Sequence, residues 1–359
     1  MDKSFFLASA SLTGAIIGAG VFAIPFVIAQ AGVLTTLAYF LVLGLITLSL
    51  HLFLADIVIF AKSKHRLAGY AEKYLGKTGK IITTVATLLG SLGALLAYLI
   101  LSGNFLSQIT PLTTTQGSWI FYLLVFLLLS LAGRALEVFD VILTIIKIVL
   151  FVSIIFLVLG VYGFSFLSPN SLLLTSNFFN LKGLLIAYGS ILFALCGYSI
   201  IPELKPDKKL KSSINVAQIT VSIVYITFAI AISGFVQSEQ FLIEQPLLHI
   251  LFNLAGVFSV MTPYLMLSWV AYDLFDKDLG FSKKQALSLT LIIPIFLFLL
   301  GIQNFMSVIS ITGGIFFGLI AILILKMYSQ KFANKNIWLI RTIQFVFALG
   351  AIAEIISMF

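Results

Sequence analysis

Apolar runs of about twenty residues recur along the whole chain and are separated by short polar segments. An α-helix needs about twenty apolar residues to cross a bilayer. The pattern therefore predicts an all-α membrane protein without a separate soluble domain. We expect eleven membrane spans, at about residues 5–29, 33–61, 81–107, 118–132, 140–162, 181–203, 213–236, 248–274, 284–302, 305–327 and 337–358.

The composition supports this class of protein and excludes others. Apolar residues make up 61% of the 359 residues and charged residues only 9%, whereas a soluble domain is about half apolar and a quarter charged. A soluble enzyme, a nucleic-acid-binding domain and a disordered scaffold are therefore excluded. The single cysteine, Cys196, forms no intrachain disulfide. No small-residue cleavage site follows the start of the chain, so we expect the first span to be retained.

The basic residues predict the orientation in the membrane. When the N-terminus is placed in the cytoplasm, nineteen of the 21 Lys and Arg residues fall on the cytoplasmic side, as the positive-inside rule requires. These are Lys3, Lys62, Lys64, Arg66, Lys73, Lys77, Lys80, Arg134, Lys205, Lys208, Lys209, Lys211, Lys277, Lys283, Lys284, Lys326, Lys331, Lys335 and Arg341. The outer side keeps only Lys182. We therefore expect a multi-pass protein of the plasma membrane, and its net charge of +8 requires no nucleic-acid partner.

Two spans carry glycine and proline at matching positions. In the first span Gly20 precedes Pro25 by five residues, and in the sixth Gly197 precedes Pro202 by five. Each of these spans begins a set of five, and the two sets have opposite orientations because five is odd. Paired interrupted spans in two inverted halves indicate the central site of a transporter. The alternative for Gly14 and Gly18 is close helix packing through small residues four positions apart.

An interrupted helix inside a membrane favours a ligand that carries both charges. Unwinding exposes backbone N–H and C=O groups that hydrocarbon does not satisfy, so the break must line a cavity or meet a ligand. The N-terminus of a half-helix favours a carboxylate, and its C-terminus favours an ammonium group or a cation. An amino acid carries a carboxylate and an ammonium group side by side.

Lys147 is the one basic residue that lies inside a span. It follows Asp140 by seven residues, or about 10 Å along a helix. One interpretation is a lysine that extends back to the cytoplasmic interface along its own stem. The other is an ionisable group that faces an internal cavity. The spacing alone leaves both open.

Four segments resemble the amino acid–polyamine–organocation superfamily, and most closely its aromatic (and hydroxy) amino acid permease branch. Ile17–Pro25 resembles the first-span motif, and His65–Gly76 resembles the first cytoplasmic loop. Leu92–Tyr98 resembles a third-span motif, with Leu92 where an aromatic residue is usual. The eighth-span segment Thr262–Leu265, followed by two Asp-Leu pairs, has Pro263 where serine is usual. The similarity extends over spans 1–10.

The resemblance implies a fold and an activity. The fold would be a leucine-transporter-like core at residues 1–336, with inverted five-helix repeats at about 5–162 and 181–327. Residues 337–359 would add an eleventh helix. The activity would be secondary active uptake of an amino acid by alternating access.

The resemblance also implies a substrate site at the two interruptions. The amides of Gly18, Ala19 and Gly20 would bind the substrate carboxylate. The carbonyls of Ile17, Phe193 and Ala194 would bind its amino group. The side-chain pocket would be shaped by Tyr98, Gly197 and Tyr198, together with Phe193. Ordinary packing, with each hydroxyl bonded to a neighbour, is the alternative for the two tyrosines.

Lys147 acquires a role from the same resemblance. In some proton-coupled relatives, a lysine at this place in the fifth span occupies the position of a sodium ion. Its ammonium would then lie next to the first-span break and the eighth span, near Thr262. Burial disfavours the charged form of a lysine, so such a group can lose and regain a proton during transport. The resemblance therefore implies H⁺ as the coupling ion, and Pro263 fits the loss of a sodium ligand.

The remaining charged residues indicate no catalytic or metal site. Asp56, Glu203 and Asp273 lie near the cytoplasmic ends of their spans, either as caps or as an inner gate that forms ion pairs with loop lysines. The three histidines show no metal-binding or catalytic spacing, so we expect no metal, no cofactor and no enzyme. No obligate protein partner is indicated.

The leading hypothesis is a proton-coupled symporter of a hydrophobic or aromatic amino acid. A sodium-coupled symporter or an exchanger of the same fold is the first alternative. A receptor that binds an amino acid without transporting it is the second.

Overall fold

The computed structural model describes residues 3–61, 65–129, 134–162, 181–204, 207, 209–233, 245–332 and 337–357. Within these residues every regular element is a helix. The first half contains α1 (Lys3–Ile16), η1 (Ala19–Ala23), α2 (Ile24–Ala31), α3 (Val33–Ala61), α4 (Leu67–Ile109), α5 (Thr114–Leu129) and α6 (Arg134–Tyr162). The second half contains α7 (Leu181–Leu195), η4 (Ile201–Glu203), α8 (Leu210–Ser233), α10 (Pro246–Asp273), η5 (Leu274–Asp278), α11 (Lys283–Leu299), α12 (Phe305–Ile311), η6 (Thr312–Phe317), α13 (Gly318–Lys331) and α14 (Ile337–Ser357).

The multi-pass membrane class predicted from the apolar runs is confirmed. Eight helical stretches of the described chain are long and apolar enough to cross a bilayer. Two further apolar helices, α5 and the described part of α7, are shorter. The expected ninth span corresponds to α11, which begins with two lysines and a glutamine. Of the basic residues used for the orientation, Lys62, Lys64, Lys205, Lys208 and Lys335 lie outside the described residues, as do the side chains of Lys3, Arg134 and Lys182.

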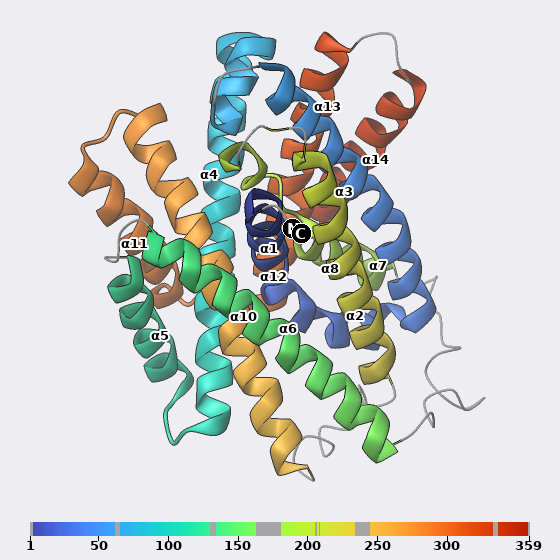
Figure 1. Cartoon of the computed structure of the whole chain (residues 1–359), viewed down its shortest axis with the longest axis vertical. Helices are drawn as coiled ribbons and strands as arrows, with labels where there is room; N and C mark the ends of the chain where they lie inside the picture. The colour runs from blue at the N-terminus through green and yellow to red at the C-terminus, as the bar shows by residue number, and fades with distance from the viewer. Residues whose placement is uncertain are drawn as a thin grey trace.

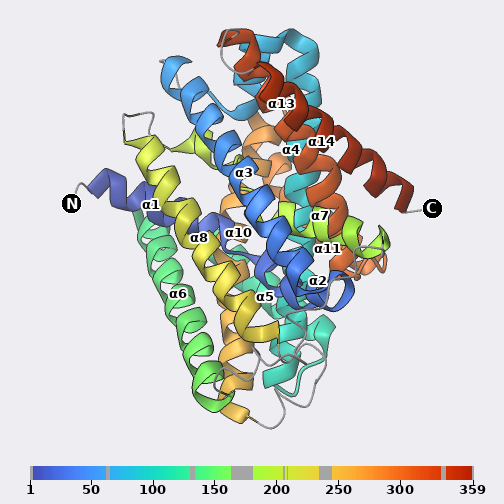
Figure 2. The ribbon, with the colours of Figure 1, turned by 90° about the vertical axis from the view of Figure 1, so that its right-hand side faces the viewer.

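The helices form a bundle around α1, which lies near the centre of the view in Figure 1. α1 packs against α8 and α6, while α10 packs against α4 and α6. α3 packs against α8 and α7. In Figure 2, α14 runs along the side of the bundle opposite to the start of α1. These contacts enclose most of the broken first span, and about four-fifths of its most apolar window is buried (78%).

The segment after the second span differs from the expected loop. Residues 67–75 form a helix that continues directly into the helix of the third span, and the joint between the two lies at Gly76. Gly76 has φ +73° and ψ −170°, a conformation that L-residues with a side chain avoid. The glycine therefore allows a helix along the membrane edge to turn sharply into the span.

The last helix, α14, is held by a buried carboxylate. Glu354 is only 3% exposed, and its Oε1 accepts a hydrogen bond of 2.5 Å from Ser310 Oγ of α12. A side chain on Gly314 would meet Glu354, and one on Gly350 would meet the ring of Tyr188 from α7. α14 is thus packed closely onto η6 and α7 as well as onto α13.

Candidate functional site

The first span is interrupted one residue after α1 ends. The Ile17 amide still donates to Thr13 O (2.9 Å), but Gly18 leaves the helix with φ −129° and ψ −142°. The chain continues as the short 3₁₀ helix η1 and enters α2, where Pro25 stands in the first turn. The residues of η1 are all buried. Backbone groups are therefore released from helical bonding in the middle of the bundle.

The second interruption has the same form. α7 ends at Leu195, and the chain passes through Cys196, Gly197 and a turn before it enters η4, in which Pro202 is the second residue. The structure thus places a break in both spans that carry the matching glycines and prolines.

The two breaks lie against each other. A Cβ placed on Gly20 would collide with the backbone of Ala194, and a Cβ placed on Gly197 would lie 2.8 Å from Ile16 Cγ1. Both glycines therefore permit close contact between segments about 177 residues apart.

Substitution of Gly20 by alanine should open this contact. The added methyl group has to displace the Ala194 backbone, and overpacking of this kind costs about 1–3 kcal/mol. We expect Gly20→Ala to weaken, about tenfold or more, the binding of the amino acid that the resemblance implies, measured by ligand-induced thermal stabilisation. Gly160→Ala in α6 is the matched control, because nothing lies within 4 Å of its added Cβ. If Gly20→Ala and Gly160→Ala bound the ligand equally well, the close contact between Gly20 and Ala194 would not be required for binding.

Three carbonyls at the end of α1 are held by side chains of other helices. Lys147 Nζ of α6 donates to Gly14 O (2.6 Å) and to Ile17 O (3.0 Å). Tyr225 Oη of α8 donates to Ile16 O (2.9 Å). Lys147 is 0% exposed, so the structure has it facing inward and not extending to the interface.

The surroundings of Lys147 are polar and buried. Thr262 is 1% exposed and also lies next to Gly14, because a Cβ built on Gly14 would be 3.2 Å from Thr262 Cγ2. The hydroxyls of Thr144 and Thr262 make no hydrogen bond within the described structure. Asp140 accepts a hydrogen bond of 2.9 Å from Ser11. Lys147 and Thr262 thus flank the same turn of α1.

A small cavity lies between the two breaks. Of the residues expected to bind substrate, Gly18, Gly20, Tyr98, Phe193, Gly197 and Tyr198 line it. Ile17, Ala19 and Ala194 are buried in the adjacent backbone and do not line it. The void is about 20 Å³, which is room for about one water molecule. A ligand larger than a water molecule therefore enters only if the aromatic walls move.

Phe317 is a wall residue that the sequence did not single out. Its ring stacks on Phe193 with centroids 5.7 Å apart, and its carbonyl accepts a hydrogen bond of 3.3 Å from Tyr198 Oη. Phe317 ends the π-helix η6, where the backbone is wider than in an α-helix. Tyr98 meets Phe193 edge-on at 6.1 Å. The cavity is thus closed by aromatic groups from α4, α7 and η6.

His51 is a second residue that the sequence analysis missed. Its side chain is 0% exposed in α3, and its Nε2 accepts the Gly197 amide at 3.1 Å. Its Nδ1 lies 3.2 Å from Gln218 Oε1 of α8, and Gln218 Nε2 donates to Thr47 Oγ1 at 3.3 Å. Only the neutral ring with hydrogen on Nδ1 makes both bonds. A chain of hydrogen bonds therefore connects α8 and α3 to the second break.

Ion pairs are present at two of the three expected gate carboxylates. Asp56 of α3 forms an ion pair with Lys211 of α8 (2.5 Å), which joins two helices. Asp273 pairs with Lys277 one turn later in the same segment (2.5 Å), and Glu203 is exposed. These pairs leave the gate role of the three residues a prediction.

An unexpected ion pair crosses the same end of the bundle. Arg66 Nε, just before α4, donates to Asp278 Oδ2 of η5 at 2.9 Å. Partial burial would lower the pKa of the Arg66 guanidinium, but the hydrogen bond to Asp278 and the negative charges of Asp278, Asp273 and Glu203 raise it. Arg66 therefore remains a cation that ties the start of α4 to η5.

Comparison with known families identifies the chain. A model of the tryptophan/tyrosine permease family matches residues 1–243, which include both breaks and Lys147. The chain belongs to the tryptophan/tyrosine permease family. This membership makes the protein a transporter and not an enzyme. Comparison with curated proteins gives no match.

Solved structures show the fold of the permease. The crystal structure of MhsT in complex with L-phenylalanine has a TM-score of 0.70 at 16% identity and covers 100% of this chain and 99% of that one. A manganese transporter from Eremococcus coleocola, in complex with an aromatic bis-isothiourea substituted compound, has a TM-score of 0.69 at 15% identity and covers 99% and 86%. The leucine-transporter-like fold implied by the resemblance is therefore confirmed. Within the described part of the permease, no three His, Cys, Asp or Glu side chains are placed to hold a metal ion.

Proposed function

We propose that this permease is a proton-coupled symporter that carries an aromatic or other hydrophobic amino acid across the plasma membrane. The observation that carries the proposal is the pair of hydrogen bonds from Lys147 to the carbonyls at the first-span break. They connect an ionisable group directly to the backbone that would hold the substrate.

The substrate class follows from the groups around the cavity. The backbone of Gly18 and Gly20 supplies amides for a carboxylate. The end of α7 supplies carbonyls for an amino group. Tyr98, Phe193 and Phe317 form an aromatic wall that favours an apolar side chain. MhsT, which shares the fold, binds L-phenylalanine in its crystal structure.

The coupling follows from what a proton changes at Lys147. The protonated ammonium holds the Gly14 and Ile17 carbonyls with charge-assisted hydrogen bonds, which are stronger than neutral ones. Loss of the proton to the cytoplasm weakens this hold, and the end of α1 is then free to move. One of the two lone pairs of Ile17 O is already used by Lys147, so the other is available to the substrate amino group. Protonation of one residue thus favours the arrangement that binds substrate.

Transport by purified protein in liposomes tests this proposal. We expect an alkaline interior to drive accumulation of labelled tryptophan, tyrosine or phenylalanine without sodium, and a protonophore to abolish it. Accumulation that requires a sodium gradient would show that the coupling ion is sodium and not the proton. Counterflow without net accumulation would identify an exchanger, and binding without counterflow a receptor.

A further inference from the structure

A groove away from the central cavity lies on the outside of the bundle between α5, α10 and α11. Its volume is about 290 Å³. Leu129, Trp269 and Leu287 form an apolar wall, and Trp269 and Leu287 are 46% and 42% exposed. The groove therefore opens to the membrane and is much wider than the cavity between the breaks.

Two lysines lie at one end of this groove. Lys283 and Lys284 are the first two residues of α11, and both are exposed. A helix N-terminus already carries partial positive charge, so two ammonium groups there repel it and each other. No ion pair to either lysine is present among the described residues. The concentration of positive charge at this end of the groove is therefore suited to an anion.

A buried polar group faces the same groove. Ser268 of α10 lines it and is 2% exposed, and its hydroxyl makes no hydrogen bond within the described structure. A buried hydroxyl without a partner costs free energy, which a ligand oxygen would recover. Cations, a hydroxyl donor and an apolar wall therefore occur together in one groove.

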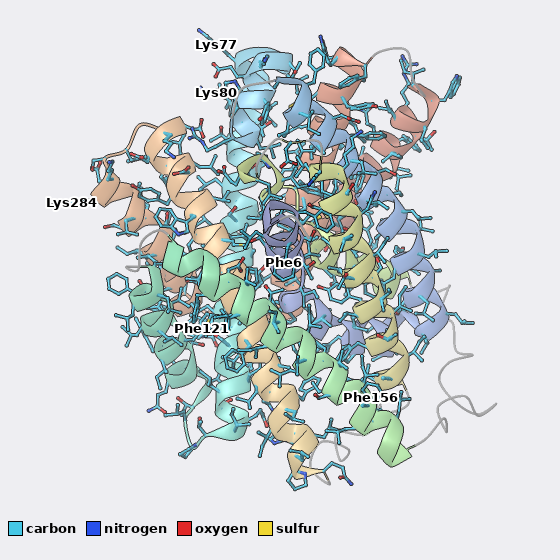
Figure 3. All side chains as sticks on the ribbon, in the orientation of Figure 1. Phe6, Lys77, Lys80, Phe121, Phe156 and Lys284 are labelled. Carbon is cyan, nitrogen blue, oxygen red and sulfur yellow. The ribbon has the colours of Figure 1, made fainter. Side chains whose placement is uncertain are left out.

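The position in the bundle fits a membrane interface. Figure 3 shows Lys284 in the same half of the molecule as Lys77 and Lys80, and away from Phe156. Trp269 contacts Tyr272 edge-on at 5.5 Å, and such aromatic pairs are frequent at the level of lipid headgroups. Basic pockets between spans at this level favour acidic lipids.

We propose that this groove binds an anionic phospholipid. The phosphate lies between Lys283 and Lys284, an ester oxygen accepts from Ser268 Oγ, and an acyl chain lies along Leu129, Trp269 and Leu287. The site does not depend on the proposed transport mechanism, because none of its residues touches the central cavity.

Trp269 reports on the lipid that contacts it. The double variant Trp119→Phe/Trp338→Phe leaves Trp269 as the single tryptophan, and both replaced side chains are exposed. In phosphatidylcholine nanodiscs with a small fraction of brominated lipid, we expect brominated phosphatidylglycerol to quench Trp269 about fivefold more effectively than brominated phosphatidylcholine. A protein that keeps only Trp119, at the other end of α5, should show no such preference. Equal quenching of Trp269 by the two lipids would overturn the proposal.

The lysines provide the second arm of the experiment. We expect Lys283→Gln/Lys284→Gln to remove the preference of Trp269 for the acidic lipid. Lys77→Gln/Lys326→Gln removes the same charge from exposed positions elsewhere and should leave the preference unchanged. A preference that survives in the Lys283/Lys284 variant would show that the groove is not its source. If that variant fails to fold, the comparison of lipids with both lysines present still decides the proposal.

Discussion

Replacement of Lys147 by methionine is expected to abolish accumulation driven by a pH gradient. Methionine fills similar volume but leaves Gly14 O and Ile17 O without their donor. Hydrogen bonds to charged groups contribute about 1.5–3 kcal/mol each, so we expect the initial rate of uptake in liposomes to fall at least tenfold. Lys77→Met is the control, because Lys77 is exposed on α4.

Lys147→Arg tests the positive charge of this residue separately from its ability to release a proton. Arginine keeps its proton under all physiological conditions, so this variant should still bind the amino acid but should not accumulate it. Binding is measured by thermal stabilisation and accumulation in the liposome assay. If Lys147→Met or Lys147→Arg accumulated substrate under a pH gradient, the coupling role of Lys147 would be wrong, while the fold and the substrate site would be unaffected.

Replacement of His51 by leucine should have the second-largest effect. It leaves the Gly197 amide without an acceptor and Gln218 Oε1 without its donor. A buried group that loses its partner costs about 1–3 kcal/mol, so we expect amino-acid affinity to fall about tenfold. Thermal stabilisation by tryptophan, titrated over concentration, measures this change.

Glutamine at position 51 is the informative partner of this variant. Its Oε1 lies at about the distance of Nε2 along the side chain and accepts the Gly197 amide, but it has no basic nitrogen. We expect His51→Gln to retain much of the affinity that His51→Leu loses. If leucine and glutamine were equally damaging, the acceptor for Gly197 would not be what His51 contributes.

The breaks and Lys147 were accessible from sequence because each violates a local rule. Glycine and proline are unfavourable within helices, and a charge within a span is costly. At Gly20, Gly197 and Lys147 these violations coincide with the crossing of the two spans in the structure. The local sequence was therefore enough to indicate that these three residues are special, but it did not indicate which residues they contact.

His51 and Phe317 were missed because their roles depend on packing between distant segments. The bond from Gly197 to His51 joins residues 146 apart, and no spacing rule connects them. A histidine in an apolar span was the available signal. Phe317 is one of 34 phenylalanines, and only the π-helix that presents it distinguishes it. The helix at 67–75 was missed because this segment is too short to cross a bilayer and carries Glu72 and Lys73, as is typical of a loop between two long spans.

The Ser310–Glu354 hydrogen bond has a consequence for the design of truncated or fused variants of this protein. A variant truncated before residue 337 would leave the Ser310 hydroxyl without its acceptor. It would also expose Gly314 and Tyr188, which lie behind the segment that carries Phe317. α14 therefore supports the aromatic wall of the cavity and is needed for its packing. A fluorescent or affinity tag should therefore be fused after α14 and should not replace it.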